Sequence, residues 1–209
     1  MKILAIESSS LVASAAIVND DILVAEYTVN HKVTHSQTLL PMIDEILTMT
    51  QTDKRSIDAI AVSGGPGSYT GLRIGSATAK GLGMALDIPL IHVPTLDAMA
   101  YNAYGYKRQG LVCPIMDARR SQVYTGIYEF SDGKFNILLE NSAITFDELM
   151  EKLDVLNTSG KKVMFIGDGI PVFKDRIDEH FKGTGYELAP ASMNRQRAAS
   201  VAVLGGIYY

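Results

Sequence analysis

The residues best suited to chemistry in this chain lie in one glycine-rich segment, residues 63–75. The apolar run 57–62 before it is typical of a buried strand, and residues 77–86 after it are typical of a helix. A glycine-rich turn from strand to helix points backbone N–H groups at an anion. The spacing fits neither the P-loop nor the dinucleotide fingerprint, so an anion site and a tight connection without a ligand both stay open. The candidate loop residues are Gly64, Gly65, Pro66, Gly67, Ser68, Thr70, Gly71 and Arg73.

The bulk composition is that of an ordinary globular protein. The 209 residues are 47% hydrophobic and 20% charged, with a net charge of −4. This charge argues against a protein that binds nucleic acid alone, but not against a subunit whose partner holds it. The single cysteine, Cys113, excludes an internal disulfide and fits a reducing compartment. With neither a signal peptide nor an apolar run that could span a bilayer, the sequence predicts a cytoplasmic protein.

The hydrophobic pattern predicts an α/β fold in two similar rounds. Strands are expected over residues 3–7, 12–18, 23–29, 57–62 and 89–93, then 111–117, 122–130, 135–140 and 162–166. Helices are expected over 34–49, 77–86 and 95–104, then 145–156, 171–181 and 195–208. Capping boxes are predicted at Thr34 with Gln37 and at Thr145 with Glu148, and Thr95 is predicted as an N-cap. The rounds indicate two mixed-sheet lobes, 1–105 and 106–209, although self-similarity by coincidence stays open.

Each round opens with an apolar strand that ends in an acid, Glu7 or Asp117. This arrangement resembles the actin, Hsp70 and sugar-kinase plan, in which such acids position a metal and phosphates. The residues after the two acids, a run of serines and Arg119-Arg120, are bulkier than the glycines expected there. Arg119 and Arg120 could instead be anion ligands or a solvated pair. We therefore predict a vestigial nucleotide site made of Glu7, Asp117, Gly167, Asp168 and Gly169.

The four histidines give little support for a metal site. Only His31 and His35 lie four residues apart, and they precede the predicted helix. No cysteine pair exists, and no third ligand can be named, so no metal is predicted.

Two helices carry surfaces suited to a partner. Small residues recur at every fourth position of the helix 77–86, which allows another helix to approach closely. The alternative is that both apolar faces belong to the core. The predicted interface consists of Leu39, Met42, Ile43, Ile46, Ile74, Ala77, Thr78, Gly81 and Ala85.

Six motifs together resemble the TsaB (YeaZ) family of bacterial tRNA threonylcarbamoyladenosine synthesis. The glycine-rich segment 63–75 and Asp117-Ala118-Arg119-Arg120 are the specific ones. The supporting motifs are Ile3-Leu4-Ala5-Ile6-Glu7-Ser8-Ser9, His35-Ser36-Gln37 with Leu39-Leu40-Pro41, Pro89-Leu90 with Val93, and Gly167-Asp168-Gly169. They cover most of the chain in order, and the resemblance implies the two-lobed actin-like (ASKHA) fold.

The resemblance also implies a non-catalytic role. TsaB-like proteins are paralogues of the catalytic subunit TsaD, which transfers a threonylcarbamoyl group to N6 of adenosine 37 of tRNA. Thr95 and Met99 stand where that paralogue has two metal-binding histidines. The expected partners are a TsaD-like subunit, a TsaE-like ATPase, tRNA through the complex, and a second copy when the chain is alone. The resemblance leaves ATP and Mg²⁺ to the partner subunits, with no cofactor bound tightly by this chain and no membrane partner.

Two rival functions stay open at this point. One is an actin-like ATPase or phosphotransferase, and the other is a peptidase, for which the missing histidine pair gives no support. The chain ends at Tyr209, where family members usually continue, so we expect a shortened second lobe.

Overall fold

The computed structural model describes residues 1–32, 34–105, 110–131 and 133–209. The chain divides into two compact units, each with its own sheet. Unit 1 is Met1–Ala98 together with Gln196–Tyr209, and unit 2 is Met99–Arg195. The short helix α3 (Thr95–Tyr101) includes the point where the chain leaves unit 1.

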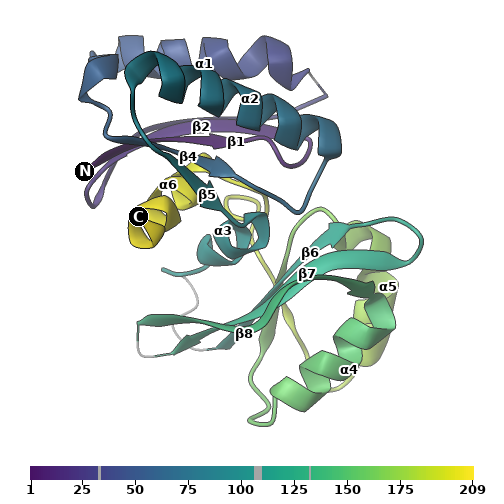
Figure 1. Cartoon of the computed structure of the whole chain (residues 1–209). Coiled ribbons are helices and arrows are strands. Elements are labelled where there is room, and N and C mark those ends of the chain that lie inside the picture. The colour runs from purple at the N-terminus through teal and green to yellow at the C-terminus, as the bar shows by residue number, and fades with distance from the viewer. Residues whose placement is uncertain (33, 106–109, 132) are drawn as a thin grey trace. The chain divides into compact units, whose positions relative to one another are not determined.

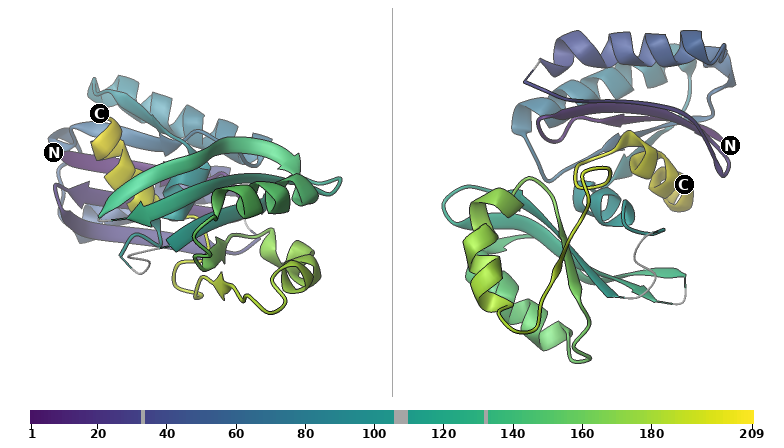
Figure 2. Two further views of the ribbon diagram at one scale, coloured as in Figure 1. Left: turned by 90° about the horizontal axis from the view of Figure 1, so that it is seen from below. Right: turned by 180° about the vertical axis from the view of Figure 1, so that it is seen from behind.

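Unit 1 is built on a mixed five-stranded sheet in the order β3-β2-β1-β4-β5. Its strands are β1 (Lys2–Glu7), β2 (Val12–Asn19), β3 (Ile22–Asn30), β4 (Ala59–Ser63) and β5 (Leu90–Val93). Strand β1 is antiparallel to β2 and parallel to β4. Helices α1 (His35–Met49) and α2 (Tyr69–Leu86) cover one face, and α6 (Ala198–Tyr208) covers the other (Figures 1 and 2). A 3-10 turn, η1 (Lys54–Ser56), precedes β4.

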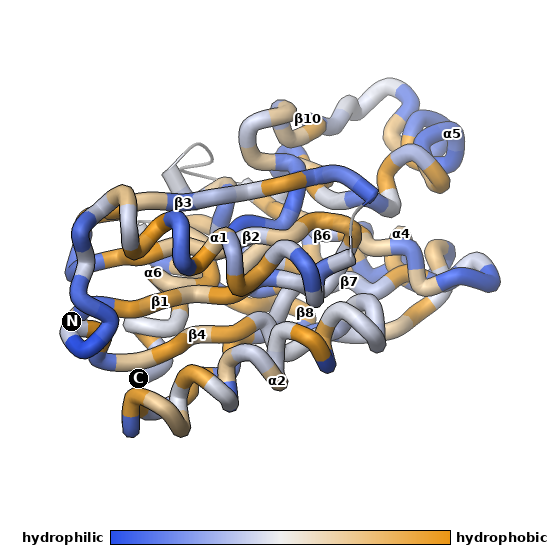
Figure 3. The backbone as a smooth tube through the Cα atoms, turned by 90° about the horizontal axis from the view of Figure 1, so that it is seen from above, coloured by the Kyte–Doolittle hydropathy of each residue, from blue (hydrophilic) through white to orange (hydrophobic). Residues whose placement is uncertain are grey.

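The centre of this sheet is apolar because helices lie on both of its faces. Strands β1 and β2 are buried along almost their whole length, and β1 and β4 are largely hydrophobic in Figure 3. Such continuous apolar runs are typical of strands covered on both sides. By contrast, most of β3 is exposed, since it lies at the edge of the sheet.

Unit 2 repeats the same plan. Its sheet has the order β10-β9-β6-β7-β8, so each strand corresponds to the one five places earlier in unit 1. Its elements are β6 (Gly110–Asp117), β7 (Gln122–Ser131), β8 (Lys134–Thr145), α4 (Phe146–Leu156), β9 (Val163–Ile166), α5 (Ile170–His180) and β10 (Glu187–Leu188). The predicted pair of similar mixed-sheet lobes is confirmed. Residue 132, in the predicted turn between β7 and β8, lies outside the described residues.

Local capping explains where the predicted helices needed correction. Helix α2 begins at Tyr69 and not at residue 77, because the Ser68 hydroxyl accepts from the Gly71 N–H at 3.3 Å and caps it. The capping box at Thr145 and Glu148 is confirmed. The capping box predicted at Thr34 with Gln37 is wrong, since the Thr34 side chain makes no capping hydrogen bond. Thr95 is the first residue of α3 and not its cap, and its hydroxyl accepts from the Gly65 N–H at 3.2 Å.

The C-terminal helix lies in unit 1, whereas the sequence assigned it with the rest of residues 106–209. Helix α6 packs on β1 and β2, and Val201, Ala202 and Leu204 are buried at no more than 1% exposure. An apolar helix is required here because the hydrophobic side chains on the second face of the sheet would otherwise be exposed to solvent. The first unit is therefore closed by residues from the far end of the chain.

Two glycines of α2 give a matched test of this packing. A Cβ on Gly71 would lie 2.1 Å from the Ser8 carbonyl oxygen, whereas a Cβ on Gly81 would have no atom of the described residues within 4 Å. We expect Gly71→Ala to lower the free energy of unfolding by roughly 1–3 kcal/mol. Gly81→Ala should raise it by up to about 1 kcal/mol, because alanine favours the helix. Urea unfolding followed by circular dichroism measures both, and equal effects at the two positions would contradict this packing.

Candidate functional site

The acid at the end of β1 is fully buried. Glu7 has no exposed surface, and its Oε1 accepts from the Ser9 N–H at 2.6 Å. Among the described residues its Oε2 has no hydrogen-bond partner. Burial raises the pKa of the Glu7 carboxyl, and hydrogen bonds from Ser9 oppose this only in part. Desolvation thus disfavours the charged form of Glu7, which is the form in which a carboxylate binds a metal ion.

The residues after Glu7 form what we call the serine turn, Ser8, Ser9 and Ser10, and the start of α2 is packed against it. The Ser68 N–H donates to the Ser9 carbonyl at 2.6 Å, and the Ser8 hydroxyl donates to the Gly71 carbonyl at 2.9 Å.

Glycine is required on the facing side of this contact. A Cβ at Gly67 would lie 2.2 Å from the Ser9 carbonyl oxygen, and one at Gly75 would lie 2.2 Å from the Ser8 hydroxyl. The glycines of the loop therefore allow α2 to approach the serine turn. At these glycines the loop therefore faces atoms of Ser8 and Ser9 and not open space.

The first half of the glycine-rich loop is tied to β5 and α3. The Gly64 N–H donates to the Val93 carbonyl at 2.9 Å, and the Thr95 N–H donates to the Gly65 carbonyl at 2.8 Å. A Cβ on Gly64 would lie 1.8 Å from the His92 ring. Pro66 lies between these bonds and the cap Ser68. Thr70 and Arg73 lie within α2, so the second half of the predicted loop is helix.

In unit 2 the structure brings Asp117, Asp168 and Arg195 together. Burial raises the pKa of the Asp168 carboxyl, the charge of Arg195 opposes this, and the charge of Asp117 adds to it. Arg195 also donates to the Gly167 carbonyl at 3.3 Å. A Cβ on Gly167 would lie 2.2 Å from the Ile115 carbonyl oxygen, and one on Gly169 would lie 3.0 Å from it. These glycines, like those of unit 1, let a turn lie close to a neighbouring strand.

The arginine pair follows β6 in a tight turn. The Asp117 carboxylate accepts from the Arg119 N–H at 2.8 Å. Arg119, Arg120 and Ser121 all have positive φ, at 65°, 50° and 59°, and all three are exposed. Within unit 2 the two guanidinium groups therefore lie on the surface.

The predicted interface on α1 is wrong. Leu39, Met42, Ile43 and Ile46 are only 1–6% exposed and belong to the core between α1 and the sheet. Ile74 of α2 also packs against this core, and Thr78 is half-buried. The sequence marked the correct apolar face of α1, but that face is covered by the chain's own sheet.

The remaining interface residues lie on an open face of α2. Ala77, Gly81 and Ala85 are exposed, and Met84 beside them is 85% exposed. On the side of α2 next to β5 lies a groove of about 570 Å³. It is lined by Val62, Ser63, Gly64, Tyr69, Leu72, Arg73, Ser76, Ala77, Lys80 and His92.

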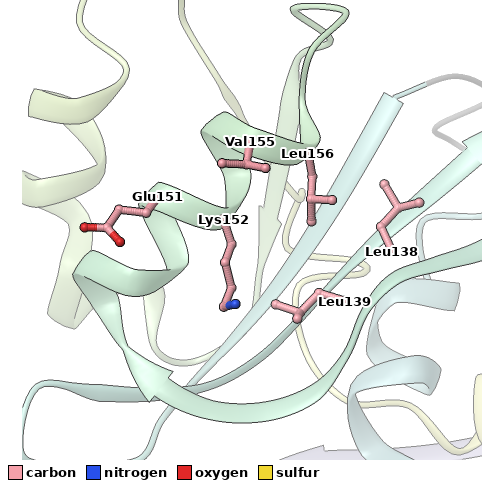
Figure 4. A pocket seen from close by; sticks show the side chains of 6 residues that line it. All are labelled: Leu138, Leu139, Glu151, Lys152, Val155 and Leu156. Carbon is pink, nitrogen blue, oxygen red and sulfur yellow. The ribbon is translucent and has the colours of Figure 1, made fainter.

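A second hollow, of about 400 Å³, lies in unit 2 between β8 and α4 (Figure 4). Leu138, Leu139, Val155 and Leu156 give it an apolar wall, and the Lys152 side chain extends toward Leu139. Its lining offers hydrophobic contact rather than acid–base chemistry.

Comparison with known proteins decides the family. Residues 24–208 match the family model described as TsaD, tRNA N6-adenosine threonylcarbamoyltransferase. The chain is 34% identical over 205 residues to the Bacillus subtilis tRNA threonylcarbamoyladenosine biosynthesis protein TsaB, covering 98% of this chain and 87% of the relative. The chain belongs to the TsaB (YeaZ) family.

Solved structures agree with this assignment. A Pseudomonas aeruginosa protein described as similar to the peptidase YeaZ has a TM-score of 0.81 at 25% identity, covering 99% of this chain and 90% of that one. Component A of (R)-2-hydroxyglutaryl-CoA dehydratase from Acidaminococcus fermentans has a TM-score of 0.50 at 12% identity, covering 98% and 95%. The second likeness concerns the fold alone. The chain has the actin-like ATPase fold, as the sequence predicted.

Within the described residues, His, Cys, Asp and Glu side chains nowhere gather in threes at a metal-binding distance. Thr95, which stands where the TsaD-like paralogue is expected to have a histidine, is buried and bonded to Gly65. None of the helices that the structure describes combines the length and apolar character needed to cross a membrane.

Sequence reasoning missed the groove beside α2. Arg73, Ala77 and Lys80 follow the helical spacing i, i+4 and i+7, which could have indicated a basic face. His92 joins them from β5, and only the order of the strands places it there.

Replacement of Glu7 tests its buried state. Burial raises the pKa of Glu7 in the folded state above its ordinary value of 4.5. Between the pKa of the unfolded state and the raised pKa of the folded state, the folded protein holds a proton that the unfolded chain releases. The free energy of unfolding therefore falls as the pH rises between these two pKa values. Glu7→Gln removes this loss. We expect the melting temperature of the variant, relative to wild type, to rise from about pH 5 to about pH 8. Scanning calorimetry across that range measures it, and a pH-independent difference would show that Glu7 is ionised in the folded protein.

Proposed function

We propose that this chain is a non-catalytic subunit in the formation of threonylcarbamoyladenosine at position 37 of tRNA. Its partners would be a TsaD-like catalytic paralogue and a TsaE-like ATPase, with tRNA reached through the complex in the cytoplasm. The family supports the pathway, since the Bacillus subtilis relative is named for threonylcarbamoyladenosine biosynthesis. The net charge of −4 is consistent with a protein that relies on a partner to hold tRNA.

The observation that carries the non-catalytic role is the filled space under α2. The serine turn directly follows the acid of β1 and is packed against the start of α2, and Glu7 has no exposed surface. A vestigial nucleotide site remains the best description of Glu7 in unit 1 and of Asp117, Gly167, Asp168 and Gly169 in unit 2. Opening the part of this site that lies in unit 1 would require breaking the hydrogen bonds from Ser68 to Ser9 and from Ser8 to Gly71.

The face of α2 supports pairing with a paralogue. Ala77, Gly81 and Ala85 leave backbone exposed along the helix, so a second helix could pack closely. Gly81 weakens the helix by about 1 kcal/mol relative to alanine, while none of the described residues would lie within 4 Å of a Cβ placed on it. A glycine at such a position is explained if a partner's backbone lies over it. A paralogue with the same fold would present an equivalent helix, and so would a second copy of this chain.

Reconstitution of the modification reaction tests this role. The chain, a cognate TsaD-like subunit and a TsaE-like ATPase are combined with threonylcarbamoyl-adenylate and tRNA, and modified adenosine is measured. We expect activity to require this chain, and Gly81→Arg to reduce activity at least about tenfold by blocking the approach of the partner. Val172→Arg, an exposed site on α5, is the matched control and should leave activity unchanged. Full activity without the chain would overturn the proposal.

A further inference from the structure

The turn between β6 and β7 holds three successive residues with side chains in the left-handed region of backbone conformation. The φ angles of Arg119, Arg120 and Ser121 are 65°, 50° and 59°. A Cβ crowds the backbone in this region, and glycine avoids that cost. Strain of this kind is concentrated at functional sites. The turn thus keeps two arginines at positions where glycine would be more favourable.

Main-chain groups of the turn hold it in this conformation. The Arg119 N–H donates to the Asp117 carboxylate at 2.8 Å, and the Gln122 N–H donates to the Arg119 carbonyl at 2.9 Å. The Phe146 N–H donates to the Ser121 carbonyl at 3.2 Å and joins the turn to the start of α4. In each of these bonds the turn contributes a main-chain group. The two arginine side chains are therefore not needed to form the turn.

The two guanidinium groups are exposed, and their charges are uncompensated. Among the described residues, no ion pair or hydrogen bond engages either of them. The acids at the start of α4, next to the turn, are already engaged. Asp147 pairs with Arg176, and the Glu148 carboxylate accepts from the Thr145 N–H at 2.8 Å. Two positive charges therefore remain for a ligand at this end of the unit 2 sheet.

Two adjacent guanidinium groups on an exposed turn suit phosphate oxygens. Arginine binds a phosphate through two parallel N–H···O hydrogen bonds. A mononucleotide is held in a concave pocket that encloses most of its surface, which an exposed turn does not provide. The backbone of a nucleic acid strand is instead bound at the protein surface, mainly by arginine and lysine contacts to its phosphates. The geometry therefore favours a polynucleotide over a free nucleotide.

We propose that Arg119 and Arg120 bind phosphate groups of the tRNA backbone in the assembled complex. Phosphate contacts carry no base specificity, so this pair positions the tRNA and does not select its sequence. The net charge of −4 is consistent with a local contact that adds to a partner's hold on tRNA.

This inference rests on the proposed function and adds the surface of unit 2 that contacts tRNA. The two can fail separately. The proposed function fails if adenosine is modified fully without this chain, whereas the inference fails if the affinity for tRNA does not depend on the two arginines.

Glycine at both positions provides the test, because it removes the guanidinium groups and suits the turn. The affinity of the reconstituted complex for tRNA is measured by fluorescence anisotropy over a series of salt concentrations. Arg119→Gly with Arg120→Gly should weaken binding at least about tenfold and should reduce the slope of log affinity against log salt by about 1 to 2. The melting temperature of the variant chain should be no lower than that of wild type, since glycine relieves the strain.

The control removes two positive charges from the other end of the same sheet. Lys134 begins β8 and Lys162 precedes β9, and both are exposed. Lys134→Ala with Lys162→Ala should leave the affinity for tRNA unchanged. Unchanged tRNA binding by the glycine variant, an equal loss in the control, or a glycine variant less stable than wild type would overturn the inference. So would a loss of affinity for ATP, titrated in parallel, with no loss for tRNA.

Discussion

The contact on which the rest of unit 1 depends is the approach of the start of α2 to the serine turn. At Gly67, Gly71 and Gly75 a single added carbon would lie 2.1–2.2 Å from atoms of Ser8 or Ser9. Interiors pack at the density of organic crystals, so this contact can form only where those side chains are absent. It fixes the position of α2 over β4 and β1, and with it the orientation of the face that carries Ala77, Gly81 and Ala85.

The same contact determines what surrounds the acid at the end of β1 in this actin-like ATPase fold. The fold places an acid at the end of β1 and a turn behind it. Here the turn consists of serines that bond to α2, and Glu7 lies beneath with one oxygen held by Ser9. A buried carboxyl with a raised pKa is costly for a protein to keep charged. In unit 1 the serine turn is part of the packing, and Ala77, Gly81 and Ala85 are exposed on the outer face of α2.

Much of the fold could be predicted from the sequence because its signals are local. Apolar runs gave the strands, Thr145 and Glu148 gave the start of α4, and repetition gave two similar sheets. The placement of α6 was missed because the hydrophobicity of Ala198–Tyr208 shows that the segment is buried and not which sheet it covers. The start of α2 was missed because glycines usually interrupt helices, whereas here Ser68 caps one that begins among them.

The candidate site was harder to predict because its residues serve packing and binding alike. Glycines after a strand indicate close backbone approach, but sequence cannot distinguish a phosphate from the protein's own turn. The apolar stripe of α1 was identified correctly and assigned to a partner, while Leu39 and Ile43 are covered by the sheet. Deciding between core and interface requires knowing which face of the helix is turned inward.

The central claim is that the serine turn closes the nucleotide site of this chain. Isothermal titration calorimetry of the isolated protein with ATP and Mg²⁺ tests it most directly, at millimolar nucleotide, with Glu7→Gln measured alongside. The account predicts no heat of binding beyond dilution for either protein. Saturable binding of one nucleotide per chain that is lost in Glu7→Gln would show that the turn opens and that the acid holds the ligand, and would contradict it.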